Sequence, residues 1–348
     1  MAQLRGLLQE LRPRMPESLV AGHGWRRLLQ RVGDLPAAAA SACGFEMKLG
    51  DPEPAADFSV AVTPGPVAGH YAAEGLGAAP GSMEGWLGRH LSDKSGPDGW
   101  IDWMLLAYDI MDVPMGRQAA PRVYLKAMLA PQAVGGFVTP ELLAATLARI
   151  AGREDHTQES RALTRTLDAL PSDAEPVFAA ATPERGPGSI RLVIGKVPVP
   201  EVGPFLDRLE WPGSASPVLR FLSGIEGVAD RFMIAFDVTA DGALPRLGLE
   251  MYPTGAGRAD YRALLTTWLT TTRANWRSLT ERLIEMELCL PAKADGLLSW
   301  PKYETVFGRE EVFRLHMGIN HVKIVIGGER LQAKAYAGLK FAPLDSQP

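Results

Sequence analysis

Apolar and polar residues alternate along residues 321–341, near the end of the sequence. Two apolar-rich runs flank Gly327-Gly328, and glycine readily adopts the positive φ values that a tight hairpin turn needs. Successive side chains of a strand point to opposite faces, so the alternation places the polar residues on one side. We predict that 321–326 and 331–339 pair as antiparallel strands. Their common polar face carries His321, Lys323, Lys334 and Tyr336.

The length of the turn decides which polar residues face each other across this hairpin. A two-residue turn pairs Lys323 with Gln332 and His321 with Lys334. A four-residue turn places Lys323 directly opposite Lys334, a like-charge pair that costs stability unless something anionic is bound. Both registers gather two ammonium groups, an imidazole and a phenol on one face, and leave open whether that face contacts water or a ligand.

Strand and helix patterns follow one another along the rest of the chain. Thr139 and Pro140 begin the clearest helical pattern, and Gly152 ends it. Further helical patterns cover 1–42 and 258–288, with a short helix near 201–210, and the segment 99–111 is interpreted as a helix or a buried run. Strands are predicted within 45–62, 121–131 and 189–195, and a hairpin that turns at Asp241-Gly242 within 230–253.

These patterns predict an α+β fold in which antiparallel hairpins and sheets alternate with helices. Strand pairs followed by helices occur in both parts of the chain, so we expect two similar α+β halves, 1–170 and 171–348. The polar, proline-rich stretch 153–188 is the candidate boundary between them. Whether the sheet closes into a barrel stays open from the sequence.

The same residue types recur on the polar faces of several predicted strands. Antiparallel sheets commonly bury one face and expose the other, and solvated faces are therefore one interpretation. The recurrence of Arg, Lys and Tyr, where Ser or Thr would serve a wet surface equally well, favours binding of an anion, a carboxylate or an extended peptide. The candidate binding residues are Arg122, Tyr124, Lys126, Arg246, Glu250, His321, Lys323, Lys334 and Tyr336.

Composition narrows the class of protein. The chain has 348 residues, of which 46% are hydrophobic and 22% charged, as in ordinary globular proteins. A net charge of −4 argues against a general nucleic-acid binder. The two cysteines, Cys43 and Cys289, match no zinc or redox spacing. The first residues lack the apolar core of a signal peptide and no run is long enough for a membrane span, so we expect a cytoplasmic protein.

Motifs that specify chemistry are absent from the sequence. It contains no HExxH, P-loop, GxSxG or DDxxD, and its glycine-rich pieces lack the spacing of a dinucleotide fingerprint. His316 and His321 are five residues apart and make a poor metal pair. Asp109 and Asp112 are interpreted as a solvated helix end rather than a cation site. We therefore predict no cofactor, no metal and no catalytic residue.

Several C-terminal stretches resemble the precursor-peptide-binding proteins of crocagin-type pathways, which accompany ribosomally made, post-translationally modified peptides. The resemblance rests on "LGLEMY", "LCLPAK", "HVKIVI" and "AKAYAG" and covers about 100 residues. It implies a protein that holds a precursor peptide for other enzymes and performs no chemistry itself. An extended peptide can add to a sheet edge or lie in a groove, which suits this role.

A second resemblance is architectural. Strand pairs lined by Lys, Arg and Tyr and alternating with helices look like the α/β-barrel aromatic prenyltransferases, especially "AYDIMDVPMGRQAAPRVYLKAMLAP" and the closing hairpin. That family binds an isoprenoid diphosphate with basic and tyrosine side chains on inward strands. Here Glu250 stands where a cation would help, and "SIRLVIG" offers only Arg191, whereas a diphosphate site needs several converging cations.

The preferred hypothesis is a non-catalytic protein that presents a ribosomally synthesised precursor peptide to the modifying enzymes of its pathway. The alternative is an aromatic or peptide prenyltransferase that uses an isoprenoid diphosphate, and a third is an adaptor with solvated polar faces. The expected partners are the precursor peptide and those enzymes, not nucleic acid or a membrane. A homodimer is left open.

Overall fold

The structure is a computed structural model of the chain. It describes residues 4–33, 40–62, 100–101, 103–111, 121–126, 138–254, 273–307, 312–328 and 330–343. All of 63–99 lies outside these ranges, as do Asp112 of the Asp109–Asp112 pair and the part of the 258–288 helical pattern before residue 273.

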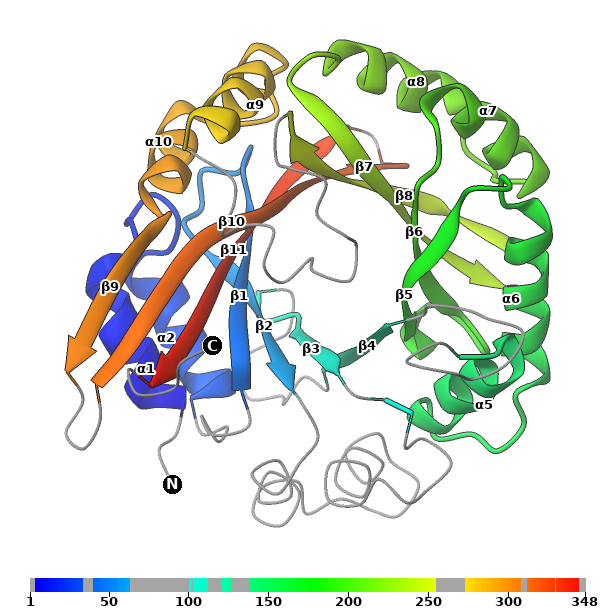
Figure 1. The fold of residues 1–348 in the computed structure, drawn as a ribbon, viewed down its shortest axis with the longest axis horizontal. Helices are drawn as coiled ribbons and strands as arrows, with labels where there is room; N and C mark the ends of the chain where they lie inside the picture. The colour runs from blue at the N-terminus through cyan, green and yellow to red at the C-terminus, as the bar shows by residue number, and fades with distance from the viewer. Residues whose placement is uncertain are drawn as a thin grey trace.

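The strands of the described residues form one sheet whose two ends meet, so that all of them except β9 lie in a closed antiparallel barrel (Figure 1). Around the ring follow β1 (Ala40–Lys48), β2 (Ala56–Val62), β3 (Met104–Tyr108), β4 (Arg122–Lys126), β5 (Glu175–Ala181), β6 (Ile190–Gly195), β7 (Ala229–Thr239), β8 (Gly242–Pro253), β10 (Val312–Ile326) and β11 (Gln332–Pro343). Strand β9 (Lys302–Phe307) pairs with the first half of β10 outside the ring. The predicted α+β fold of antiparallel strands is confirmed, and its sheet is a barrel.

The barrel closes through β11, which pairs with β10 on one side and with β1 on the other. The register places Phe45 opposite Ala337 and Glu46 opposite Tyr336. The ring also joins the two predicted halves, because β4 pairs with β5 across residue 170. Strands from both ends of the chain therefore contribute to the same interior.

The helices lie outside the ring (Figure 1). They are α1 (Leu4–Leu11), α2 (Gly22–Val32), α5 (Pro140–Ile150), α6 (Thr157–Ala169), α7 (Val199–Arg208), α8 (Ala215–Gly224), α9 (Arg273–Glu285) and α10 (Pro291–Ser299), with short 3-10 helices at Arg12–Arg14 (η1) and Pro183–Arg185 (η3). The predicted cap of α5 is confirmed, because Thr139 Oγ1 accepts a hydrogen bond from the Leu142 amide. No helix in the described ranges is long and apolar enough to cross a membrane.

The main core lies between the outer face of the barrel and these helices. Phe45 on β1 is fully buried, and its ring packs edge-on against Trp25 of α2, Phe58 of β2 and Trp300 after α10. Glu46, the next residue, points to the opposite face, as the period of a strand requires. The apolar residues of the strands therefore pack outward, and the polar faces line the inside of the ring.

The closing hairpin is confirmed with the four-residue turn. Lys323 lies opposite Lys334, and Val325 opposite Gln332. The second predicted hairpin, which turns at Asp241-Gly242, is also confirmed as β7 and β8. The helical interpretation of 99–111 is wrong over β3, where buried and half-buried residues alternate as in a strand that is packed on one face.

Candidate functional site

The barrel encloses a cavity of about 250 Å³. At roughly 30 Å³ for each water in the liquid, this volume holds on the order of eight waters, so the cavity has room for a short stretch of peptide. Every strand of the ring contributes side chains to its wall. The polar faces predicted from the sequence therefore surround a chamber instead of facing bulk solvent.

The structure brings together most of the predicted binding residues. Those that line the cavity are Arg122, Tyr124, Arg246, Glu250, His321, Lys323, Lys334 and Tyr336. Lys126 does not line it, and its Nζ lies 5.8 Å from the ring centre of Trp103, which does. Arg246 is the exposed member of the set.

One side of the chamber, here called the lysine wall, consists of Glu46, Glu250, His321, Lys323, Lys334 and Tyr336 on β1, β8, β10 and β11. The facing lysines do not share an anion, because each has its own carboxylate. Lys323 Nζ lies 3.0 Å from Glu250 Oε1, and Lys334 Nζ lies 2.5 Å from Glu46 Oε1. Paired carboxylates thus offset the like-charge contact that the four-residue turn creates.

These pairings set the ionisation of the wall. Burial raises the pKa of Glu46, but attraction to Lys334 and hydrogen bonds from Lys334 and Tyr336 outweigh it and lower the pKa to about 2. Burial likewise opposes ionisation of Glu250, whose pKa is nevertheless lowered by Lys323. The pKa of Lys334 is raised, because Glu46 outweighs the effect of burial. Both ion pairs are therefore formed at neutral pH.

His321 lies between the two ion pairs. Its ring stacks on Tyr336, with centroids 4.0 Å apart and planes at 22°. Burial lowers its pKa to about 4, although Glu250 opposes this shift, so the imidazole is neutral at pH 7. Among the described residues neither ring nitrogen has a hydrogen-bond partner. A neutral imidazole offers one donor and one acceptor, the same pair that a peptide amide needs.

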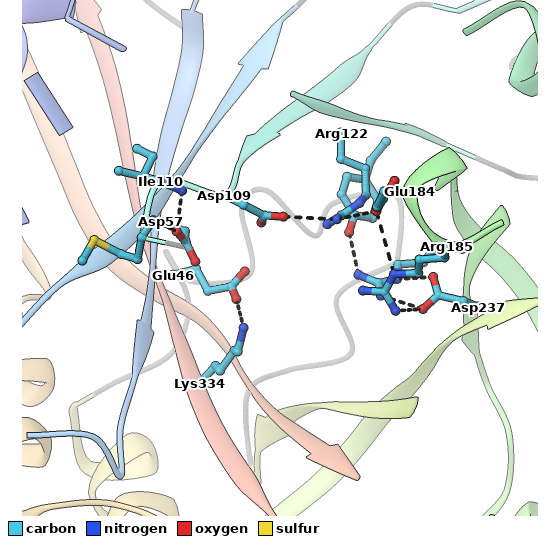
Figure 2. A network of polar contacts seen from close by, with 12 residues as sticks. Glu46, Asp57, Asp109, Ile110, Arg122, Glu184, Arg185, Asp237 and Lys334 are labelled. Atoms are coloured by element: carbon cyan, nitrogen blue, oxygen red, sulfur yellow. Dashed lines mark hydrogen bonds and ion pairs between the residues drawn. The ribbon is translucent and has the colours of Figure 1, made fainter. Parts of the chain in front are cut away.

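The facing side is here called the arginine wall and consists of Arg122, Tyr124, Arg185, Arg191 and Asp237 on β4, η3, β6 and β7. Figure 2 labels Arg122, Arg185 and Asp237 of this wall. Asp237 is fully buried and accepts from Arg191 Nε at 3.0 Å and Nη2 at 2.8 Å. Arg185 binds the same carboxylate. Two arginines therefore share one buried carboxylate.

Arg122 has a different environment on the same wall. Its Nη2 lies 3.2 Å from Asp109 Oδ2 and 2.8 Å from Glu184 Oε1 (Figure 2). The side chains of these two carboxylates are 52% and 50% exposed, so they lie at the rim of the chamber. Ion pairs with such exposed groups are weak, typically under about 1 kcal/mol. The buried Nε of Arg122 has no acceptor among the described residues.

Tyr124 is the phenol of the arginine wall, and it lines the cavity beside the arginines. Its hydroxyl accepts a hydrogen bond from Arg191 Nη1 at 3.2 Å. Burial raises the pKa of this phenol, but the positive charges of Arg191, Arg122 and Lys323 together lower it below the usual value. Proximity to cations makes the hydroxyl a stronger hydrogen-bond donor.

The sequence prediction missed three carboxylates that organise the chamber, Glu46, Asp57 and Asp237. Asp237 lies within the apolar run "FMIAFDV". A lone carboxylate in a buried strand needs a cationic partner, and this signal could have identified it from the sequence. Asp57 accepts from the amides of Ile110 and Met111 at 2.7 and 3.0 Å. Burial and neighbouring Glu46 raise its pKa to about 6.

No group of three or more His, Cys, Asp or Glu side chains in the described ranges has the geometry of a metal site. The chamber instead combines buried ion pairs, one neutral imidazole and aromatic surface. Part of its apolar surface comes from a cluster on β5, β6, β7 and β8, of which Phe178, Val193, Met233, Ala235 and Tyr252 line the cavity. Such a surface can bind a mixed polar and apolar ligand.

Of three comparisons with known proteins, the one with solved structures found a match. No protein-family model matches the chain, and no curated protein matches it. Among solved structures, the chain is similar to the apo form of the prenyltransferase PriB, with a TM-score of 0.50 over 95% of this chain and 94% of that one. The sequence identity is 15%. The similarity is one of fold. It supports the architectural resemblance to prenyltransferases, whereas the resemblance to crocagin-type peptide-binding proteins has no support in these comparisons.

Proposed function

We propose that this protein is a non-catalytic peptide-binding protein that holds part of a ribosomally made precursor peptide in its barrel and presents the peptide to modifying enzymes. The observation that carries this proposal is the pairing of the buried cations. Lys323 and Lys334 each have a glutamate, and Arg185 and Arg191 share Asp237. The chamber is therefore nearly balanced in charge while remaining rich in hydrogen-bonding groups.

A balanced chamber disfavours an isoprenoid diphosphate. A diphosphate carries several negative charges, and sites for it present cations that are free to make charge-assisted hydrogen bonds. Here Arg122 has half-exposed partners that can exchange, and to reach further buried cations such a ligand would have to displace Glu46, Glu250 or Asp237 from their partners. Removing one member of a buried ion pair leaves the other charge uncompensated, which costs about 3–5 kcal/mol.

A peptide, in contrast to a diphosphate, does not require free cations. Its backbone amides are neutral and need donors and acceptors in equal number, and its side chains need apolar surface. His321 offers one unpartnered donor and one unpartnered acceptor. The patch around Met233, Phe178 and Tyr252 offers apolar surface within the same cavity.

Prenyl transfer is the second candidate, favoured by the aromatic side chains that line a barrel of the same fold as a prenyltransferase. Trp103, Phe178 and Tyr252 could pack against an isoprenoid chain or an aromatic acceptor. This function requires the diphosphate to bind. The two candidates therefore differ in a directly measurable property.

Binding experiments on the intact protein separate the candidates. We expect calorimetry with dimethylallyl and geranyl diphosphate to detect no binding at micromolar concentration, and affinity selection from a mixture of randomised peptides to enrich a defined subset. Ala107→Trp, which fills the cavity, should abolish the enrichment, and Arg161→Trp on the exposed side of α6 should leave it unchanged. Enrichment that survives Ala107→Trp would contradict binding in the chamber. Micromolar diphosphate binding that depends on Lys323 and Arg191 would support prenyl transfer instead.

A further inference from the structure

The arginine wall contains two hydrogen-bond donors that have no strong partner among the described residues. Within the described residues, the buried Nε of Arg122 has no acceptor. Tyr124 accepts from Arg191, and no described residue accepts its hydroxyl proton. Arg122 and Tyr124 lie two residues apart on β4, so both side chains point to the same face of the strand and line the cavity.

The existing partners of Arg122 are suited to exchange. Asp109 and Glu184 are half exposed, and water can solvate either of them if it leaves the guanidinium. Arg191 differs, because two of its nitrogens bind the fully buried Asp237 and a third binds Tyr124. Among the buried cations of the two walls, Arg122 is therefore the one whose carboxylate partners can be replaced at low cost.

We propose that Arg122 and Tyr124 form a carboxylate-binding site for the peptide. This inference rests on the proposed function and identifies the part of the peptide that the chamber recognises. A guanidinium binds a carboxylate through two parallel N–H···O bonds, and the Tyr124 hydroxyl can donate a third. One exchangeable arginine matches the single negative charge of a carboxylate and not the several charges of a diphosphate.

The closed ring favours the end of a chain as the source of this carboxylate. The cavity accommodates only a short stretch of peptide, and a continuous segment of a peptide would have to enter and leave it. A C-terminal carboxylate can enter first and reach Arg122 at the wall. An N-terminal amine would need a free carboxylate, but Glu46, Glu250 and Asp237 are engaged with cations, and Asp57 accepts from two backbone amides. The carboxylate of an Asp or Glu side chain is the other source of the same group.

The test uses the intact protein and mixtures of N-acetylated randomised peptides without Asp or Glu, synthesised once as free acids and once as C-terminal amides. A third mixture consists of amides with Glu at one position. Peptides retained by the protein are quantified by mass spectrometry. We expect at least tenfold tighter retention of the free acids than of the plain amides, which corresponds to about 1.4 kcal/mol. Preference for the Glu-containing amides would equally support a carboxylate site and assign it to a side chain.

Two variants connect the preference to the site. Arg122→Gln and Tyr124→Phe should each remove most of the preference for a carboxylate while the plain amides bind as before. Arg165→Gln removes a partly exposed arginine of α6 that pairs with Glu210 outside the barrel, and this variant should retain the preference. Equal retention of acids and amides by the wild type would overturn the carboxylate site and leave peptide binding intact. Failure to retain any mixture would overturn both proposals.

Discussion

The two walls of the chamber differ in how their cations are paired with carboxylates. On the lysine wall each cation has its own buried or half-buried carboxylate, so Lys323 with Glu250 and Lys334 with Glu46 form closed pairs. On the arginine wall two arginines share Asp237, and Arg122 depends on carboxylates at the rim. The lysine wall is therefore charge-balanced within the protein, whereas the arginine wall keeps binding capacity for an external anion.

The largest effect on the free energy of unfolding is expected for Lys323→Met, which tests whether the ion pairs of the lysine wall stabilise the fold. Lys323→Met leaves Glu250 buried beside no ammonium group, which should lower the free energy of unfolding by about 3 kcal/mol. Adding Glu250→Gln removes the uncompensated charge and should recover most of the loss. Urea unfolding of the single and double variants measures both effects. A single variant as stable as the wild type would remove the distinction between the walls.

The same reasoning applies to a variant in which both Lys323 and Lys334 are replaced with alanine. The structure places both lysines in ion pairs with Glu250 and Glu46 inside the barrel. A double alanine variant would therefore lose stability for electrostatic reasons whether or not the lysines bind a peptide. Charge-neutral double variants are the appropriate probes of this wall.

A pH titration should separate two carboxylates that lie opposite each other on β1 and β2, Glu46 and Asp57. The pKa of Asp57 is raised to about 6 in the folded protein, so the folded state binds more protons than the unfolded state between about pH 4 and 6. The contribution of Asp57 to stability should therefore increase as pH falls from 7 to 4, by about 1–2 kcal/mol for this half-buried group. Asp57→Asn should abolish that increase in thermal or urea unfolding.

The pKa of Glu46 is lowered to about 2, so its contribution to stability has the opposite sign. It is present above the unfolded pKa, near 4.5, and is lost as pH falls through 2. Between pH 7 and 4.5 the two effects do not overlap, and the difference between wild type and Asp57→Asn isolates Asp57. A difference in unfolding free energy that does not change with pH would contradict the raised pKa.

The smallest expected effect on stability belongs to Arg122. Because its carboxylate partners are half exposed, Arg122→Gln should change the free energy of unfolding by under about 1 kcal/mol. Comparison with Lys323→Met under identical urea conditions measures the contrast between the walls directly. A loss of 3 kcal/mol or more would mean that Arg122 is as structural as Lys323.

Local patterns accounted for much of the fold. The closing hairpin, the hairpin at Asp241-Gly242 and the cap at Thr139 were predictable, because each depends on residues close together in the sequence. Closure of the barrel was not predictable, because the pairing of Phe45 with Ala337 joins distant segments that carry no local signal for each other. The strand β3 was missed because its apolar residues fit a buried helix equally well.

Part of the candidate site was also predictable, because the alternation of side chains along a strand is a local pattern. Alternation identified which side chains of a strand share a face, and this placed Arg122, Tyr124, Lys323 and Lys334 on the polar faces that line the cavity. Alternation does not reveal which strands face each other across a barrel. The ion pairs of Glu46 and Asp237, which decide how much charge remains for a ligand, are therefore known from the three-dimensional arrangement alone.

The position of β11 has a consequence for synthesis of the protein on the ribosome. The ring needs β11 between β1 and β10, so the barrel cannot close until the last strand has emerged from the exit tunnel. Before then β1 presents an unpaired edge, and exposed edges favour association with other chains. A chain that stops before Gln332 should therefore accumulate as aggregate rather than as a smaller folded barrel. Expression of such a truncated chain beside the full-length protein would measure how strongly the nascent barrel depends on protection by chaperones.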